Sequence, residues 1–543
     1  MDPNVISNPE KSNEYDDSPS LAHLVIKNLT QAGDKIVLIS GITGEELSAK
    51  DLLSRSIEVA KSLKAVGIRP GDVVSIVCEN RFEFAFVLFG TILLNCQFAP
   101  INLTYSEREM AHTLSLSKPG ILFTSAFASD RVVSVAKSLS FVKKVVLIND
   151  ENSYGPSVTL FSDFISSSAA RSTLYTPLAV DKSKTVSIIL CSSGTTGLPK
   201  GVQLSQSNMI VVTRFCKNTI FGLDKTAGEK IILGLIPWFH AFGLTTLTGI
   251  IAGNAGTMVL LPKFEEGLFL SCIENYRCNV TFLVPPLMVF LAKHPMVDGY
   301  DLSSMRVVIC GAAPLSKELE QAVYDRLKNS KLTIRQGYGM SEMSLSVILQ
   351  KSVFKPGSVG DVNEGSVVKV IDENGKSLGP NQRGELCFQG NQLMVGYIGD
   401  EKSTKDTIDK DGWLHTGDVG YYDDDKQFFI VDRIKELIKW KGFQVPPAEI
   451  EAVLLTHRLI RDAAVIGVPD DLAGELPLAF VVRVDKNLTE QEVIDFVAKT
   501  ASPAKRLHGG VWFVDEIPKN PSGKILRREL RELVKKSNLK AKL

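Results

Sequence analysis

Apolar residues recur at two spacings along most of this chain. Between positions 48 and 67 they return every three or four residues, which predicts a helix, and the compact apolar run at 72–77 predicts a buried strand. Similar runs predict further strands at 144–147, 185–190, 257–261, 281–284 and 306–310. Helices alternating with buried strands indicate an α/β fold with parallel sheets.

The pattern changes after position 367. Shorter strands at 367–371, 384–388 and 428–431, separated by Gly and Asp turns, predict a β-rich subdomain. Beyond 432–435 a second unit follows, with a helix starting at Pro447, a capping box of Thr489 and Glu492, and strands at 463–468, 478–484 and 511–514. We therefore expect a large N-terminal domain over 21–431, a hinge at 432–435 and a small mobile α+β domain over 436–540.

Composition narrows the possible classes of protein. The 543 residues are 44% hydrophobic, and Lys plus Arg equals Asp plus Glu at 61 each, so no overall field draws the chain to nucleic acid. The eight cysteines form no C-x-x-C pair, which favours a reducing compartment. Residues 1–20 are polar and acidic, so we expect them to be disordered and to be neither a secretory signal nor a presequence. The longest apolar run, 84–94, is too short to span a bilayer and predicts a core helix.

A loop rich in Gly, hydroxyl groups and Lys follows the strand at 185–190. It reads SSGTTGLPKGV from Ser192 to Val202. Its glycines let backbone N–H groups approach an anion, its hydroxyls donate hydrogen bonds and Lys200 adds a positive charge, so the loop is suited to phosphate. It lacks the spacing of a Walker A loop. The predicted phosphate-binding residues are Ser192, Ser193, Gly194, Thr195, Thr196, Gly197 and Lys200, with Gly201 as a third turning glycine.

At this loop the chain resembles the adenylate-forming enzymes, which include acyl-CoA synthetases, coumarate-CoA ligases and beetle luciferases. The resemblance runs from about position 43 to the C-terminus, and it is strongest to insect luciferase-like fatty acyl-CoA synthetases. Further motifs occur in family order: Gly337-Tyr-Gly-Met-Ser-Glu342, Gly417-Asp418, Asp432-Arg-Ile-Lys435 and Pro521-Ser-Gly-Lys524. The resemblance implies a ligase that uses ATP, Mg²⁺ and CoA.

The family motifs imply a nucleotide site. Tyr338 is expected to stack on adenine, Asp418 and Arg433 to hold the ribose, and Glu342 with Thr195 to hold Mg²⁺. Because the GYG motif follows the strand-like segment 332–335, we expect it at the C-terminal end of a strand, where open α/β sheets bind ligands. The remaining expected ATP contacts are Gly311, Ala312, Ala313, Gln336, Gly337, Gly339, Met340 and Ser341.

The resemblance also implies two alternating arrangements of the C-terminal domain. Lys524 is expected to bridge the substrate carboxylate and the α-phosphate in the first half-reaction. Rotation about Lys435 would then withdraw Lys524 and bring a second catalytic residue, Lys439, to the CoA tunnel. The expected CoA-binding residues are Lys439, Lys441, Gly442 and Phe443.

The acyl group is expected beside the segment Trp238 to Gly243. Family position places His240 near the carboxylate, with an apolar lining of Phe239, Phe242, Leu345 and Val347. A fatty acid of medium to long chain is the favoured substrate. A beetle-type luciferase stays open, because Leu345-Ser346 departs from the small residues of luciferases while Arg214-Phe215 matches an Arg-Phe pair that they carry. A coumarate-CoA ligase also stays open, and a non-catalytic protein is disfavoured because the catalytic positions are filled.

The chain ends in Ala541-Lys542-Leu543, a near match to the Ser-Lys-Leu peroxisomal address. In a family that is often sent to peroxisomes, this tripeptide predicts a peroxisomal location and the peroxisomal import receptor as a partner.

Overall fold

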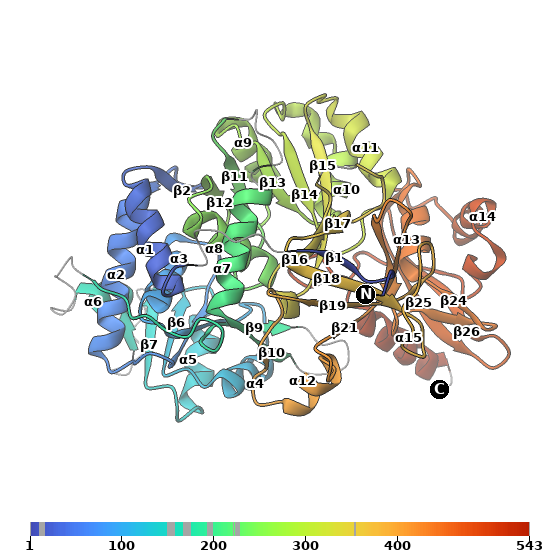
Figure 1. The fold of residues 1–543 in the computed structure, drawn as a ribbon. Coiled ribbons are helices and arrows are strands. Elements are labelled where there is room, and N and C mark those ends of the chain that lie inside the picture. The colour runs from blue at the N-terminus through green and yellow to red at the C-terminus, as the bar shows by residue number, and fades with distance from the viewer. Residues whose placement is uncertain are drawn as a thin grey trace.

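The computed structural model describes residues 2–9, 17–148, 158–166, 175–192, 199–220, 222, 228–351 and 354–541. Two large sheets and a β-rich sheet form the N-terminal part, and a smaller sheet with three helices forms the C-terminal part (Figure 1). This is the predicted α/β class with a small α+β unit at the C-terminal end.

The first large sheet has eight strands. Its order is β20-β10-β9-β5-β4-β6-β7-β8, and the six strands from β9 to β8 pair in parallel, as alternation with helices predicts. In chain order the strands are β4 (Val73–Val77), β5 (Gln97–Pro100), β6 (Ile121–Ser125), β7 (Lys144–Ile148), β8 (Val158–Leu160), β9 (Val186–Ser192), β10 (Lys200–Ser205) and β20 (Gly396–Tyr397).

The second large sheet has nine strands in the order β17-β16-β15-β14-β13-β11-β12-β2-β3. The six from β15 to β2 are parallel, and antiparallel strands close both edges. They are β2 (Ile36–Ser40), β3 (Glu46–Ser48), β11 (Ile231–Gly234), β12 (Thr257–Leu260), β13 (Val280–Leu283), β14 (Val307–Cys310), β15 (Thr333–Gly339), β16 (Ser346–Leu349) and β17 (Asp361–Val362).

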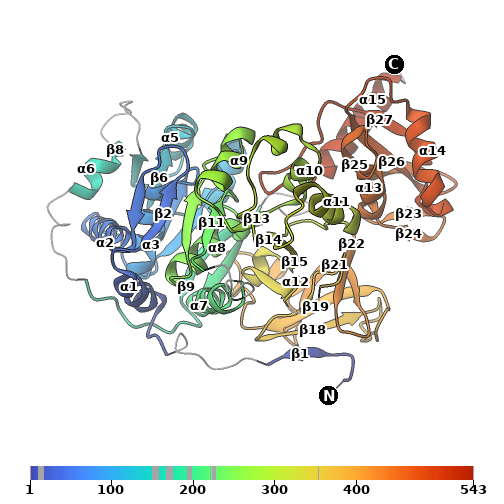
Figure 2. The same cartoon turned by 90° about the horizontal axis from the view of Figure 1, so that it is seen from above.

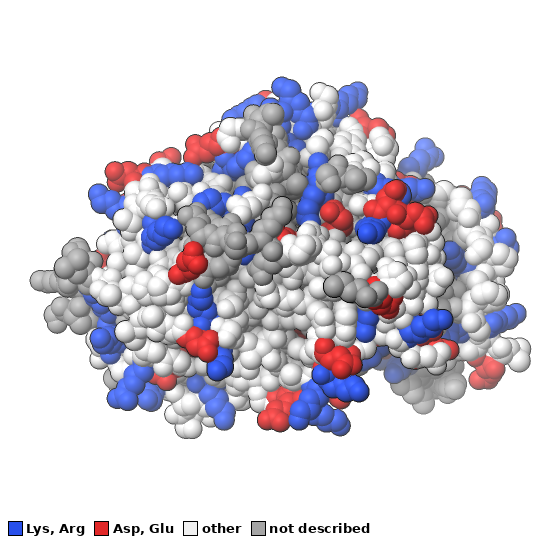
Figure 3. Space-filling view, viewed as in Figure 1, with Lys and Arg blue, Asp and Glu red and all other residues white. Residues whose placement is uncertain are grey.

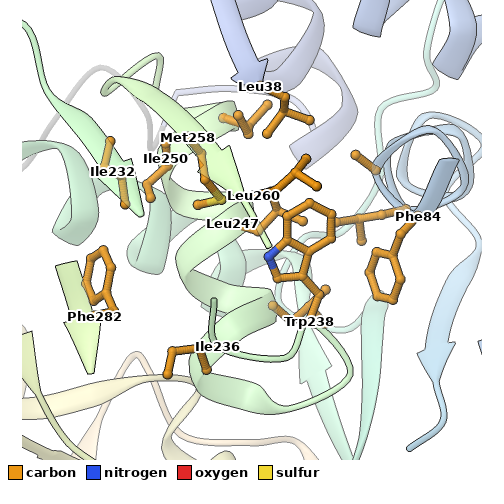
Figure 4. Packing of buried hydrophobic residues seen from close by; sticks show 14 of the residues in the cluster. Leu38, Phe84, Ile232, Ile236, Trp238, Leu247, Ile250, Met258, Leu260 and Phe282 are labelled. Atoms are coloured by element: carbon orange, nitrogen blue, oxygen red, sulfur yellow. The ribbon is translucent and has the colours of Figure 1, made fainter. Parts of the chain in front are cut away.

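One apolar cluster joins the two large sheets. The helices that contribute to it include α1 (Leu21–Ala32), α2 (Ala49–Ala65), α3 (Phe82–Leu93), α7 (Gln206–Phe215) and α8 (Ala241–Ala252). Near its centre Trp238 lies beside Phe84, with Leu247 and Leu260 on the other side of the indole (Figure 4). The rings of Phe84 and Trp238 meet edge to face with centroids 5.5 Å apart, an arrangement that aromatic quadrupoles favour. This buried packing fixes the segment that leads into His240.

The remaining helices of the N-terminal part are shorter or lie farther along the sheets. They are α4 (Glu107–Ser117), α5 (Ser129–Lys137), α6 (Phe161–Ser166), α9 (Glu266–Asn275), α10 (Pro285–Lys293), α11 (Lys317–Leu327) and α12 (Glu401–Thr407). Ser316 caps the start of α11, because its side chain accepts the backbone N–H of Leu319. The run at 84–94 lies in α3, a core helix as predicted. Among the described residues, no helix has the length and apolar character needed to cross a membrane.

The β-rich sheet has the order β1-β18-β19-β21-β22. Its strands are β1 (Ile6–Asn8), β18 (Ser366–Ile371), β19 (Gly384–Gly390), β21 (Leu414–Tyr422) and β22 (Phe428–Arg433). The prediction of disorder over residues 1–20 is wrong for Ile6–Asn8, which pairs with β18 at one edge of the sheet (Figure 2). Ile6 packs on the apolar cluster of this sheet, and Asn8 donates a side-chain hydrogen bond to the carbonyl of Val362 at 2.9 Å.

The C-terminal unit has the strand order β24-β23-β26-β25, with β27 beside β26. The helix start at Pro447 and the capping box of Thr489 and Glu492 are confirmed. The elements are β23 (Ile438–Trp440), β24 (Phe443–Val445), α13 (Pro447–Leu455), β25 (Ile460–Asp470), β26 (Gly474–Arg483), α14 (Glu490–Thr500), β27 (Val511–Phe513) and α15 (Arg527–Ala541). Acidic and basic side chains are interspersed over the face seen in Figure 3, in keeping with the balanced composition.

The contact between α2 and α3 generates a stability prediction. A Cβ on Gly90 would lie 2.7 Å from Val59 Cγ1 and 2.9 Å from the carbonyl oxygen of Ser56. Helix propensity alone makes Gly→Ala stabilising by about 0.5–1 kcal/mol. We expect Gly90→Ala instead to lower the free energy of unfolding by about 1–3 kcal/mol, because the two helices must separate.

Unfolding in urea measures this change. Gly299→Ala is the matched control, since a Cβ there meets no atom within 4 Å, and its midpoint should stay unchanged. A Gly90→Ala protein as stable as the parent would contradict the close packing of α2 and α3.

Candidate active site

The segment that precedes His240 is held by hydrogen bonds to Asn80, a residue distant in the sequence. Asn80 accepts the backbone N–H of Trp238 at 2.9 Å and donates to the carbonyl of Ile236 at 3.1 Å. His240 then caps α8, its Nδ1 accepting the N–H of Phe242 at 3.3 Å. A ring nitrogen that accepts a hydrogen bond carries no proton, so this contact favours the neutral imidazole with its proton on Nε2.

Charge and burial act in the same direction on His240. Burial, and then the positive charge of Lys524, lower the pKa of His240 to about 4. His240 is therefore neutral at physiological pH. The electrostatic influence of Lys524 also shows that the C-terminal unit brings this residue to the His240 segment.

Three of the predicted acyl-binding residues, Phe239, His240 and Phe242, lie at the start of α8. Phe239 and Leu345 are buried, and Phe242 packs edge to face on Phe282 with ring centroids 5.8 Å apart. The edge of the Phe242 ring also lies against Gly311, where a Cβ would be 3.7 Å from Cε1. The expected apolar lining is thus next to the expected nucleotide loop. Val347 differs, because it packs within the apolar cluster of the β-rich sheet and not in the cluster that contains Leu345.

The loop after β14 turns sharply at Ala312. Its φ of 70° is in the left-handed region, which is unusual for a residue with a Cβ. Gly311 donates its N–H to the carbonyl of Leu283, and the loop continues through Ala313 to Leu315, whose N–H reaches the Gln336 side chain at 3.4 Å. The predicted adenine-side loop and the strand of the GYG motif are therefore tied together.

The GYG motif lies at the C-terminal end of β15, as predicted. The strand extends through Gly337 and Tyr338 to Gly339 because β16 pairs with this extension. A Cβ on Gly339 would lie 1.8 Å from the carbonyl oxygen of Leu345, so only glycine fits where the chain folds back. Met340 and Ser341 then lead into a short 3₁₀ turn containing Glu342.

A buried cluster links the motif to other sheets. The Tyr338 hydroxyl donates to Asp418 Oδ2 at 2.6 Å, and the Arg433 Nε lies 3.3 Å from Asp418 Oδ1. The Tyr338 ring stacks on Phe388. Burial and the adjoining Asp418 charge raise the pKa of Tyr338, so its hydroxyl stays a donor. The two predicted ribose residues, Asp418 and Arg433, thus meet at the predicted adenine residue.

Glu342 has a partner that the sequence analysis missed. Its Oε1 accepts the hydroxyl of Tyr397 at 2.8 Å, and Lys200 Nζ lies 4.8 Å from the centroid of the Tyr397 ring. Lys200 also donates to the hydroxyl of Ser403 at 2.8 Å. Tyr397 lies on β20 and Ser403 on α12, both distant in sequence from Glu342 and Lys200.

The phosphate loop is described only at its two ends. Ser192 ends β9 and pairs with Lys200 at the start of β10. Gly201 lies inside β10, where a Cβ would be 2.5 Å from Ile398, so this glycine permits close strand packing and is not the turning residue that we expected. The other predicted phosphate-binding residues lie outside the described residues; they are Ser193, Gly194, Thr195, Thr196 and Gly197.

Lys524 sits in a tight turn against the N-terminal part. Asn520 accepts the backbone N–H groups of Ser522 and Lys524, and a Cβ on Gly523 would lie 3.1 Å from Val284 and 3.3 Å from Pro286. Burial, followed by the charge of Arg433, lowers the pKa of Lys524 to about 8, while Asp418 acts in the opposite direction. The C-terminal unit therefore presents Lys524 to the cluster of Asp418, Arg433 and His240.

The predicted CoA-binding residues are not brought to this cluster. Lys439 is exposed on β23, and Lys441 and Gly442 form the exposed turn before Phe443, both with positive φ. The Lys441 ammonium lies over the ring of Trp440, which stacks on His508 with centroids 4.9 Å apart. Lys435 is exposed in the turn after β22. The structure thus holds the arrangement with Lys524 inward.

Known proteins resemble this chain over most of its length. The chain is 42% identical over 508 residues to luciferin 4-monooxygenase of Nipponoluciola cruciata, covering 92% of each chain. It is 40% identical over 520 residues to 4-coumarate-CoA ligase 1 of Narcissus pseudonarcissus, covering 93% of this chain and 92% of the relative. The solved fatty acyl CoA synthetase of Mycobacterium tuberculosis superposes with a TM-score of 0.71 at 25% identity, covering 95% and 98%.

Two family models match the chain. The AMP-binding enzyme model covers residues 26–398, and the model of the AMP-binding enzyme C-terminal domain covers residues 449–524. Together with the motifs and the fold, these matches place the chain in the AMP-binding enzyme family, the adenylate-forming superfamily.

Proposed function

We propose that this protein is an ATP-dependent acyl-CoA synthetase for fatty acids of medium to long chain. It would form acyl-AMP with release of pyrophosphate and then transfer the acyl group to CoA. The observation that carries the proposal is the position of Lys524, which faces the nucleotide residues Asp418 and Arg433 and also the neutral His240 beside an apolar lining.

The electrostatics of this position suit adenylation. A carboxylate and the α-phosphate of ATP repel each other, so their approach requires a cation between them. Lys524 provides one mobile positive charge, and the neutral His240 adds no second cation to compete with it. The reaction attaches the carboxylate oxygen to the α-phosphorus and expels pyrophosphate. In the second half-reaction the CoA thiol attacks the acyl carbonyl and AMP leaves.

The carboxylate of Glu342 fits a magnesium site. Mg²⁺ prefers hard oxygen ligands and keeps substrate phosphates and waters as its other ligands. The Tyr397 hydroxyl occupies one position on Glu342 Oε1 and fixes the carboxylate, which has further acceptor positions. Glu342, with Thr195, would hold the ion, which when bound neutralises charge on the β- and γ-phosphates.

An apolar acyl chain is supported by the residues around His240. Phe239, Phe242 and Leu345 present no charged group, and burial of an aliphatic chain against such residues contributes about 0.8 kcal/mol per CH₂. The similarity to the solved fatty acyl CoA synthetase of Mycobacterium tuberculosis supports the same class of substrate.

A luciferase is the second candidate function, and a specific observation favours it. The relative from Nipponoluciola cruciata, a luciferin 4-monooxygenase, is 42% identical over 92% of this chain. Arg214 and Phe215, the pair expected of luciferases, are buried near the end of α7. Leu345 opposes this reading, since its side chain is larger than those expected beside a bulky heterocycle. The 40% identity to 4-coumarate-CoA ligase 1 of Narcissus pseudonarcissus supports aryl acids as a third candidate class of substrate.

A substrate panel decides among these functions. Purified protein would be given ATP, Mg²⁺ and CoA with fatty acids of medium to very long chain, hydroxycinnamates and firefly luciferin, and pyrophosphate, CoA ester and light would be measured. We expect pyrophosphate and acyl-CoA from fatty acids with little light. Strong light with feeble acyl-CoA formation would establish the luciferase instead, and turnover of hydroxycinnamates alone would establish the aryl ligase.

Lys524 generates a prediction about the two half-reactions. Lys524→Ala should lower the rate of acyl-AMP formation by at least about a hundredfold, because the charge between the two anions is lost. Transfer from preformed acyl-AMP to CoA should be largely retained, since Lys524 is withdrawn in that step. Lys439→Ala serves as the opposite control and should impair transfer more than adenylation. Equal loss of both half-reactions in Lys524→Ala would refute the assigned role.

The same role predicts a pH dependence of adenylation. Lys524 is charged below its pKa of about 8 and loses its charge as the pH rises through that value. The kcat/KM for acyl-AMP formation should therefore decline above about pH 8, because kcat/KM reports ionisations of the free enzyme. A profile that stays flat well above this pH would contradict the required charge.

The Lys524-inward arrangement is held at both ends of α10. Val284 and Pro286 meet the Lys524 turn at the N-terminal end, and Lys293 meets the C-terminal unit at the other (Figure 2). Lys293 Nζ donates to the carbonyls of Leu455 and Ile460 at 2.7 and 3.0 Å and lies 3.5 Å from a third, that of His457. A cation at the carbonyl end of α13 is favoured by the helix dipole.

We predict that Lys293→Met weakens the inward arrangement. Charged hydrogen bonds contribute about 1.5–3 kcal/mol, so the balance between domain arrangements should shift by about ten- to a hundredfold. Acyl-AMP formation should slow, while transfer from preformed acyl-AMP to CoA should be retained or faster. Stopped-flow measurement of each half-reaction separates the two effects.

Lys351→Met is the matched control. Lys351 is also half-buried and donates to a carbonyl, that of Val362 at 2.9 Å, but within the N-terminal part. Its loss should leave the ratio of the two half-reaction rates unchanged. The same change of ratio in both variants would overturn the role of Lys293.

The peroxisome is the compartment that we propose for this enzyme. The support is the tripeptide Ala541-Lys542-Leu543 and its match to the Ser-Lys-Leu address, which the peroxisomal import receptor would bind. Lys542 and Leu543 lie outside the described residues.

A further inference from the structure

Three side chains of different chemistry converge on one face of the β-rich sheet, away from the nucleotide residues described above. They are Glu385 and Cys387 on β19 and His415 on β21. Cys387 and His415 are cross-strand partners, and Glu385 precedes Cys387 by two positions, so the three side chains share a face. Their ligating atoms all lie within 4.8 Å of one another.

We propose that Glu385, Cys387 and His415 form a binding site for a transition-metal dication, specifically Zn²⁺. The proposal is independent of the acyl-CoA synthetase function, because none of these residues is assigned to ATP, acyl or CoA binding.

The geometry around one ring nitrogen points to a shared central atom. His415 Nδ1 lies 3.0 Å from Glu385 Oε2 and 3.5 Å from Cys387 Sγ. An imidazole nitrogen has one in-plane position, holding either a proton or a lone pair, so it cannot form good hydrogen bonds to both neighbours at once. Tetrahedral zinc with ordinary bond lengths separates N from O by roughly 3.3 Å and N from S by roughly 3.6 Å. The observed spacings are close to both values.

The other ring nitrogen supplies a second, independent observation. Asp409 Oδ2 lies 3.4 Å from His415 Nε2. Asp409 is itself held by the backbone N–H groups of Asp411 and Trp413, each at 2.9 Å. Metal-binding histidines nearly always donate their second ring N–H to such a carboxylate, which fixes the tautomer and the ring orientation. His415 is therefore oriented with Nδ1 toward Glu385 and Cys387.

Charge and access are compatible with a zinc site. Burial, followed by the charge of Glu385, raises the pKa of Cys387 to about 12, so the metal must displace the thiol proton, as zinc ordinarily does. The nearby Lys369 acts in the opposite direction and favours the thiolate. The side chains of His415 and Glu385 are 32% and 20% exposed, which leaves a route from solvent and a position for water as the fourth ligand.

The site is connected to the nucleotide residues through Glu385. Its Oε2 faces His415, while its Oε1 accepts the N–H of Gly417 at 2.9 Å, in the part of β21 that carries Asp418. The pairing of β21 with β19 shifts register at this point, and Gly417 has a φ of 68°. Movement of Glu385 toward a metal would remove its hydrogen bond to Gly417 and alter this part of the strand, and we infer that bound Zn²⁺ raises the KM for ATP.

Cobalt provides a direct test of the binding site. The full-length, reduced protein would be stripped of metal by chelation and titrated with Co²⁺, whose thiolate complexes absorb in the near ultraviolet. We expect one equivalent of Co²⁺ to give this band, Zn²⁺ to abolish it, and excess Mg²⁺ to leave it in place. Absence of the band, or its loss on addition of Mg²⁺ alone, would overturn the proposal.

Three variants identify the ligands. Cys387→Ser should remove the cobalt band, and Asp409→Asn should weaken Zn²⁺ affinity about 10–100-fold while keeping the band. Cys272→Ser is the control, since Cys272 lies on α9 with its thiol directed at the carbonyl of Gly41, and it should bind as the parent does. A band that persists in Cys387→Ser would refute the site. Thermal unfolding of each metal-free variant checks that the fold is retained.

A separate experiment tests the effect of bound Zn²⁺ on the KM for ATP. Zn²⁺ at one equivalent should raise the KM for ATP in the parent and not in Cys387→Ser. An unchanged KM in zinc-loaded parent protein would overturn the connection through Glu385. Because cobalt and zinc binding need no turnover, failure of the proposed acyl-CoA synthetase activity is distinguishable from failure of the metal site.

Discussion

The buried carboxylate of Asp418 is the constraint on which the rest of the site depends. It accepts the Tyr338 hydroxyl at 2.6 Å and lies beside Arg433, so it joins the nine-stranded sheet to the β-rich sheet at the start of the interdomain segment. A buried carboxylate without partners costs several kcal/mol, and these contacts satisfy its oxygens and aim it at one place. Lys524 approaches the same point from the C-terminal unit. The nine-stranded sheet, the β-rich sheet and the C-terminal unit therefore meet around the carboxylate of Asp418.

Placing the charged side chain of Lys524 beside this cluster has an energetic cost of its own. The cations Arg433 and Arg527 oppose another positive charge here, while Asp418 and Glu436 favour it. The lowered pKa of Lys524 reflects mainly its burial, which is a cost to the inward arrangement. Contacts elsewhere in the interface offset that cost, notably the carbonyl bonds of Lys293 at the far end of α10. A domain held by a few polar contacts can leave again, as the two half-reactions of the proposed function require.

Individual residues show how far sequence reasoning reached. The strands and helix caps followed from local pattern, and the ordered motifs identified Asp418, Tyr338 and Lys524 before their contacts were visible. The strand Ile6–Asn8 was not predicted, because a polar segment can pair with the edge of a strand that is distant in sequence. Gly201 was wrongly predicted to be a turning residue, because a glycine is needed there only to leave room for Ile398. Tyr397 was missed because its value to Glu342 arises only when β20 lies against β10. In each case the deciding contact is remote in sequence.

The sequence by itself determined the α/β class and the family to which the chain belongs, and it predicted the residues proposed to hold phosphate, ribose and a carboxylate. These features depend on local periodicity and on ordered motifs, which are written within short stretches. Tertiary structure alone decided that Lys524, and not Lys439, faces His240 and Asp418, and that Glu385, Cys387 and His415 meet. These outcomes depend on strand pairing and on interdomain hydrogen bonds between segments far apart in the chain, and no local pattern records them.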